Sequence, residues 1–215
     1  NGQSHIKSQP CIPINNFNKT TVAPQEFQLK AKETETLIPV IECVDGELIT
    51  NRLNLPPNIK DGFLTTDIDR DLLKIAVVNR YKESPIAVSF IKNFGLKEGA
   101  IASSVAHDSH NIIVVGVDDE SIARAVNLLV ENKGGLSAVS NSENLYVALP
   151  VAGLMTNEDG YVVAEKYTKL DLMAKQMGSQ LGSPYMSLSF MALLVIPSLK
   201  LSDLGLFDGE SFAFV

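Results

Sequence analysis

Nine residues in the middle of the chain, 103–111, concentrate several chemically capable side chains in one short run. They include two of the three histidines of the chain, with one aspartate, three serines and one asparagine. Apolar residues flank the run at 99–102 and 112–117. Two apolar runs joined by a polar segment are typical of neighbouring strands and their connection. Because sites are often built on loops at the mouth of a buried sheet, this run is a candidate site.

Within this run, the chemistry of five consecutive side chains is compatible with several roles. They could hold a metal ion, although two histidines and one aspartate leave the coordination sphere incomplete. They could form a Ser–His–Asp nucleophile, although neighbours in one turn rarely align in the required order. They could also do no chemistry and only tie the two strands together through local hydrogen bonds. The five residues are His107, Asp108, Ser109, His110 and Asn111.

Two other stretches have the apolar periodicity of amphipathic helices. In the first, apolar residues recur at i, i+3, i+4, i+7 and i+8 from Ile122, after three acidic residues and before a glycine pair. The second is predicted to run from about residue 157 to 177, with a capping box of Thr156 and Asp159, and to end at Gly178. Its predicted buried stripe comprises Val163, Tyr167, Leu170, Ala174 and Met177.

Strand-like runs account for most of the remaining ordered sequence. They lie at 37–44, 47–50, 72–78, 86–91, 99–102 and 112–117, with a hairpin at 135–140 and 145–149. Residues 187–193 alternate loosely and continue apolar to Pro197, and we count them with the strands. Since strands outnumber helices, we predict an α+β fold with a mixed or largely antiparallel β-sheet and two main helices.

The composition indicates which binding partners and which cellular compartment to expect. A net charge of −7 argues against a nucleic-acid partner, because phosphate neutralisation needs clustered Lys and Arg. The longest apolar run, 190–196, is too short to cross a membrane. Cys11 and Cys43 lie far apart without a Cys-x-x-Cys spacing, so we expect reduced thiols in a cytoplasmic protein. His5 lies near the start of the sequence, and we expect it to have no chemical role.

The chain divides near residue 35. Residues 1–35 contain scattered prolines and an asparagine cluster without a regular period, so we predict an extended arm that is poorly packed or clasps a neighbouring chain. Residues 36–215 form the predicted α+β domain. The chain opens with Asn1 rather than methionine and has no signal peptide, so we interpret it as cut from a longer protein.

Long motifs in a preserved order run through residues 37–215. They lie at 71–80, 94–112, 149–155, 184–193, 195–197 and 205–208. Together they closely resemble the C-terminal domain of bacterial adenine deaminases. One departure stands at Asn79-Arg80-Tyr81, where the family usually has an acidic residue and a histidine flanking the arginine. Any role of that acid or histidine in relatives is therefore in doubt for this chain.

The resemblance implies an enzyme that hydrolyses adenine to hypoxanthine and ammonia, with metal chemistry in a (β/α)8 amidohydrolase barrel. Such a barrel takes about 250 residues, and a dinuclear site needs a His-x-His pair with further ligands. This chain has three histidines and no His-x-His. We therefore expect the barrel, with a dinuclear Mn or Fe site, to lie upstream, and no metal or cofactor within this chain. The arm is expected to follow the small β domain that accompanies the barrel.

The resemblance also adds a role for residues 107–111, which is to cover the substrate pocket of the upstream barrel. Adenine presents ring nitrogens and an exocyclic amine, and His, Asp, Ser and Asn supply matching donors and acceptors. We therefore expect the motif at a strand end, on a surface that is partly open here and covered in the whole enzyme. The alternative is a non-catalytic subunit-assembly module with a purely structural polar motif. We expect a homo-oligomeric enzyme.

Overall fold

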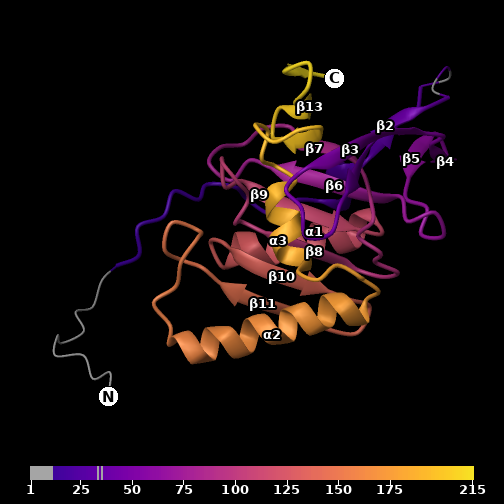
Figure 1. Ribbon diagram of the computed structural model, residues 1–215. Coiled ribbons are helices and arrows are strands. Elements are labelled where there is room, and N and C mark those ends of the chain that lie inside the picture. The colour runs from indigo at the N-terminus through magenta and orange to yellow at the C-terminus, as the bar shows by residue number, and fades with distance from the viewer. Residues whose placement is uncertain (1–11, 33, 35) are drawn as a thin grey trace.

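A mixed eight-stranded sheet forms the centre of the molecule (Figure 1). The computed structural model describes residues 12–32, 34 and 36–215. The strand order is β11-β10-β8-β9-β6-β7-β2-β3; the β2–β7 pair is parallel and the other neighbours are antiparallel. The strands are β2 (Ile38–Cys43), β3 (Thr50–Leu55), β6 (Leu73–Val78), β7 (Ala87–Lys92), β8 (Ala100–Ser103), β9 (Ile112–Gly116), β10 (Gly135–Val139) and β11 (Asn144–Ala148).

Helices cover both faces of this sheet, so its central strands β6, β8 and β9 are buried along their whole length. Side chains alternate between the faces. Ala76 and Val78 of β6 pack with helix α1 (Asp119–Glu131) on one face. Ile75 and Val77 point to the other face, whose core includes residues of α2 (Gly160–Gln176) and α3 (Pro184–Phe190). The predicted α+β class with a mixed sheet is confirmed.

Both predicted helices are present, with one shifted start. Asp118 caps α1 by accepting the N–H of Ser121, and the apolar stripe of α1 is buried. Helix α2 begins at Gly160 rather than 157, because the Asp159 carboxylate accepts the N–H groups of Tyr161 and Val162 and so acts as the N-cap. In its predicted stripe Leu170, Ala174 and Met177 are buried, and Val163 and Tyr167 are half-buried against the same core.

Two strand predictions are wrong. Residues 187–193 do not form a strand, because helix α3 runs through Pro184–Phe190 and buries Ser187, Leu188 and Ser189 alike. A helix buried on several sides has no single apolar stripe to signal it. The partner of β2 is not 47–50 but β3, which begins at Thr50. That residue is fixed from outside the hairpin, since its N–H donates to Pro197 O and its hydroxyl to Leu199 O.

Two small sheets and one 3-10 turn complete the described part of the chain. One sheet has the order β1-β5-β4 and the other β12-β13-β14. Among the described residues, no helix is long and apolar enough to cross a membrane. The bounds are η1 (Pro24–Phe27), β1 (Leu29–Lys30), β4 (Asn58–Lys60), β5 (Phe63–Thr65), β12 (Leu199–Ser202), β13 (Gly205–Asp208) and β14 (Ala213–Phe214).

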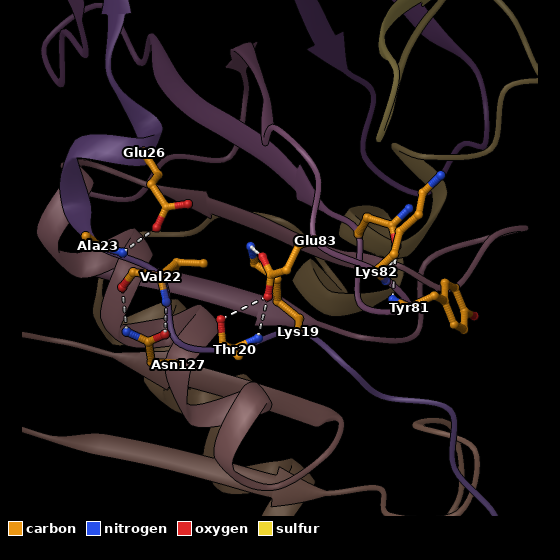
Figure 2. Close-up of polar contacts among 10 residues, drawn as sticks. Lys19, Thr20, Val22, Ala23, Glu26, Tyr81, Lys82, Glu83 and Asn127 are labelled. Atoms are coloured by element: carbon orange, nitrogen blue, oxygen red, sulfur yellow. Dashed lines mark hydrogen bonds and ion pairs between the residues drawn. The ribbon is translucent and has the colours of Figure 1, made fainter.

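The described part of the arm is fastened to this same domain (Figure 2). Lys19, which is 4% exposed, pairs with the Glu83 carboxylate, and Thr20 donates to it through both its N–H and its hydroxyl. The Asn127 amide both accepts from and donates to the backbone of Val22. The prediction of a poorly packed arm is therefore wrong for residues 17–27, whereas Ile12 and Ile14 are 92% and 86% exposed. The domain boundary near residue 35 stays a prediction.

Candidate functional site

Residues 104–111 connect β8 to β9 at one end of the sheet. The same end carries the C-terminus of β6 and the start of β10, because Val78 pairs with Ile112 and Ser103 with Leu136. The predicted position at a strand end is confirmed. Along the five candidate residues exposure varies: Asn111 is buried, His107 and His110 are half-buried, and Asp108 and Ser109 are exposed. The loop is therefore partly open in this chain.

Helix α3 supports His107. The N–H of His107 donates to Ser189 O at 3.0 Å, and the His107 ring stacks on Phe190 with 5.2 Å between ring centroids. The His110 ring meets the His107 ring edge-on at 5.3 Å. The structure thus brings the two candidate histidines together and rests His107 on a helix that was not predicted.

A buried arginine outside the predicted set holds the far end of the loop. The Asn111 side chain accepts the N–H of Arg80 at 3.2 Å and donates to the Ser109 hydroxyl at 3.2 Å. In return, Arg80 Nε donates to His110 O at 2.6 Å. The only sequence signal for this residue was its place in the departure at 79–81, since a single arginine after a strand is otherwise unremarkable.

The surroundings of His110 favour the neutral imidazole. Burial lowers the pKa of His110, and electrostatic repulsion from His107 and Arg80 lowers this pKa further, while Asp108 acts in the opposite direction. The Nδ1 atom is buried and has no hydrogen-bond partner among the described residues. His110 is therefore a neutral group near pH 7, able to donate or accept a hydrogen bond.

An open pocket of ≈ 450 Å³ lies beside the loop. Asp108 and Ser109 form part of its wall. Most of the other lining side chains are apolar, and several of these are strongly exposed, including Val195 at 65% and Leu204 at 76%. Polar donors and acceptors next to exposed apolar surface are the combination found where ligands or partners bind.

The described residues give little support to the other two chemical hypotheses for the loop, a metal site and a Ser–His–Asp nucleophile. Among the described residues, no group of three or more His, Cys, Asp or Glu side chains is placed to hold a metal ion. No hydrogen bond within the described residues links a serine hydroxyl to His107 or His110, so the arrangement of a Ser–His–Asp nucleophile is not seen. Cys43 is a free, buried thiol whose pKa is raised by burial to about 11. His5 and Cys11 lie outside the described residues.

In the comparison with known proteins, the matching family model and the similar relatives carry the same name. The family model for the adenine deaminase C-terminal domain matches residues 47–213. This chain is 45% identical, over its whole length, to the adenine deaminase of Borreliella afzelii and 47% identical to that of Salinibacter ruber. It is 48% identical, over 98% of its length, to that of Methanosarcina acetivorans. The chain spans only 39% of the length of each of these relatives. It belongs to the adenine deaminase C-terminal domain family.

Proposed function

We propose that this chain is the C-terminal part of an enzyme that hydrolyses adenine to hypoxanthine and ammonia, and that residues 107–111 face the substrate pocket of an amidohydrolase barrel elsewhere in the same protein. The names of the relatives support the reaction. The observation that carries the role of the loop is its contrast in burial. Asn111 anchors it while Asp108 and Ser109 stay exposed beside a pocket.

The side chains of the loop match the chemistry of adenine. The Asp108 carboxylate can accept from an exocyclic amine, and an imidazole can donate to a ring nitrogen. Deamination also needs a hydroxide at neutral pH, which a metal ion supplies by lowering the pKa of bound water. No suitable ligand set occurs among the described residues. We therefore assign the dinuclear Mn or Fe site to the barrel, and binding or water exclusion to this loop.

The test uses the full-length enzyme with Asp108→Asn and His107→Ala. We expect kcat/KM for adenine to fall by about 10²-fold in each, because a misplaced or missing orienting group near the reacting atoms has an effect of that order. The matched control is Glu143→Gln, which changes an exposed acid in the turn between β10 and β11. Wild-type kcat/KM in both loop variants would refute the proposed role of the loop.

A subunit-assembly module is the second candidate. Exposed apolar side chains gather near the same pocket, with Phe214 of β14 in its wall and Phe212, in the turn before β14, against Phe207. The same variants separate the two functions. Loss of kcat with intact assembly supports the pocket role, whereas dissociation with normal rates per site supports assembly. We also propose a homo-oligomeric, cytoplasmic enzyme. The free thiol of Cys43 is consistent with a reducing compartment.

A further inference from the structure

The guanidinium of Arg80 joins three segments that lie far apart in the sequence. Arg80 is only 3% exposed. Its Nε donates to His110 O at 2.6 Å, its Nη2 to Ala152 O at 2.8 Å, and its Nη1 to Asn15 Oδ1 at 3.2 Å. These partners belong to the candidate loop, to the turn after β11 and to the arm. The position of each segment is therefore linked to one side chain.

The acceptors around this cation are neutral. Within the described part of the chain, no carboxylate pairs with Arg80, whose Nη2 also donates to the Tyr81 hydroxyl at 3.0 Å. The rings of Tyr81 and Phe17 lie 4.6 Å and 5.7 Å from its Cζ. A buried charge without a counterion is unfavourable unless directed bonds and cation–π contacts compensate for it. Such an arrangement suits the planar fork of arginine and not the single point charge of lysine.

The backbone next to Arg80 fastens the arm as well. Arg80 O accepts the N–H groups of Asn18 and Lys19, at 2.8 Å and 3.1 Å. Three residues further on, Glu83 binds the Lys19 and Thr20 side chains (Figure 2). On the opposite side, the Tyr81 hydroxyl donates to Ser109 O at 2.8 Å. Residues 79–83 therefore hold the arm on one side and the candidate loop on the other.

Arg80 also bears on the protonation of His110. The Nδ1 atom of His110 is buried without a partner among the described residues, and Arg80 is bound to the carbonyl of the same residue. A proton on Nδ1 would be a buried donor without a partner among these residues, and the positive charge of Arg80 acts against added charge on the ring. The proton is therefore favoured on Nε2, which makes His110 a hydrogen-bond donor.

We propose that Arg80 is a positioning residue that fixes the loop backbone at His110, links it to the arm, and presents the neutral His110 ring with Nε2–H as a donor to a purine ring nitrogen. This inference rests on the proposed function of the loop. Arg80 acts through His110 and does not itself touch substrate. The charged and titratable groups that act on His110 are His107, Arg80 and Asp108.

The first test measures adenine kcat/KM in full-length enzyme carrying Arg80→Lys or Arg80→Gln. We expect a loss of about 10²-fold in both, because neither side chain can hold His110, Ala152 and Asn15 together. The control is Arg124→Lys. Among the described residues, Arg124 also binds neutral oxygens alone, those of Ser140 and Asn144, but at the opposite end of the sheet. Its kcat/KM should stay at the wild-type value.

The second test measures the pKa of His110, which a merely structural role of Arg80 would leave unchanged. Removing the positive charge in Arg80→Gln should raise the pKa of His110, whereas Arg80→Lys should leave it closer to wild type. Hydrogen exchange at the imidazole C2 position, followed by mass spectrometry across pH, reads this value for His110 without reference to activity. In Arg80→Gln the acid limb of the kcat/KM profile should move to higher pH. An unchanged His110 titration would overturn the electrostatic part of the proposal.

The variant His110→Ala is measured first, because it distinguishes a failure of this inference from a failure of the proposed function. If His110→Ala keeps wild-type kcat/KM, the role of the loop fails first. If His110→Ala loses activity while Arg80→Lys keeps it, the positioning role of Arg80 is overturned alone. Should the Arg80 variants not fold, Tyr81→Phe removes only the hydroxyl that bridges Arg80 and Ser109 O. We expect a several-fold loss there, and wild-type kcat/KM in that variant would also contradict the proposal.

Discussion

Two polar connections between antiparallel strands look alike in the sequence and differ in the structure. The turn between β10 and β11 is bonded largely within itself: the Ser140 hydroxyl accepts the N–H groups of Ser142 and Glu143, and Ser140 N–H donates to Glu143 O. It also accepts from Arg124 at Ser140 O and Asn144, and Asn141 N–H donates to Glu98. The loop between β8 and β9 depends on distant groups. His107 binds Ser189 O, and Arg80 binds His110 O.

This contrast distinguishes a turn that only reverses the chain from a loop whose position is fixed by residues distant in the sequence. A turn bonded largely within itself satisfies most of its polar groups locally. The β8–β9 loop engages α3, the segment after β6 and, through Arg80, the arm and the turn at Ala152. Such remote support is what a site requires to keep its side chains in place.

The largest expected effect is at Gly153, which leaves room for the Arg80 side chain. Gly153 has φ +72, and a Cβ there would lie 2.3 Å from Arg80 Nη1. We expect Gly153→Ala to lower the free energy of unfolding by about 2–4 kcal/mol, through backbone strain and overpacking. The control is Gly62→Ala, with φ +81 and open space around its Cβ, which carries the strain alone. Urea unfolding compares them, and equal losses would show that the Arg80 contact is not tight.

A smaller effect is expected at Ser104, which is fully buried at the start of the β8–β9 loop. Its hydroxyl accepts the N–H of Gly135 at 2.8 Å and donates to Gly153 O. Ser104→Ala leaves these buried groups unpaired, so we expect a loss of about 1–3 kcal/mol. Ser142→Ala, at an exposed position of the turn between β10 and β11, should change stability by less than about 0.5 kcal/mol. Comparable losses in the two variants would contradict the distinction between the connections.

The smallest predicted effect is a pH dependence of the arm attachment. Hydrogen bonds from the Lys19 side chain and from Thr20 lower the pKa of Glu83 from 4.5 to about 2. A carboxyl group with a lowered pKa stabilises the folded state above its unfolded value, and this contribution is lost as the pH falls from about 4.5 towards 2. Amide exchange at residues 18–22 should therefore accelerate over that interval. In Glu83→Gln this acid-dependent step should disappear, and its persistence would assign it to another group.

Much of the scaffold could be predicted because its signals are local. The apolar runs on either side of residues 103–111 indicated β8 and β9, and the stripe from Ile122 indicated α1. Helix α3 was missed because its serines are as buried as Leu188, so its sequence alternates like a strand. The start of β3 was missed because Thr50 is fixed by residues near 197–199.

The site itself could be predicted only in part. The five loop residues could be proposed as a candidate site because their types are concentrated in one run. The support they receive could not be found, because the partners of Arg80 lie at residues 15, 110 and 152. An arginine after a strand ordinarily indicates a solvated position, and only tertiary packing shows that this one is buried.

Thiol labelling of the full-length enzyme tests the central claim most directly. Ser109 and Ser142 are both exposed in this chain, one in each of the two connections. We expect Ser109→Cys to react slowly with a water-soluble maleimide, because the rest of the enzyme covers the β8–β9 loop, and more slowly still with a competitive purine bound. Ser142→Cys should react at the rate of a free thiol in both cases. Equal, fast labelling of the two cysteines, with no protection by the purine, would contradict the account.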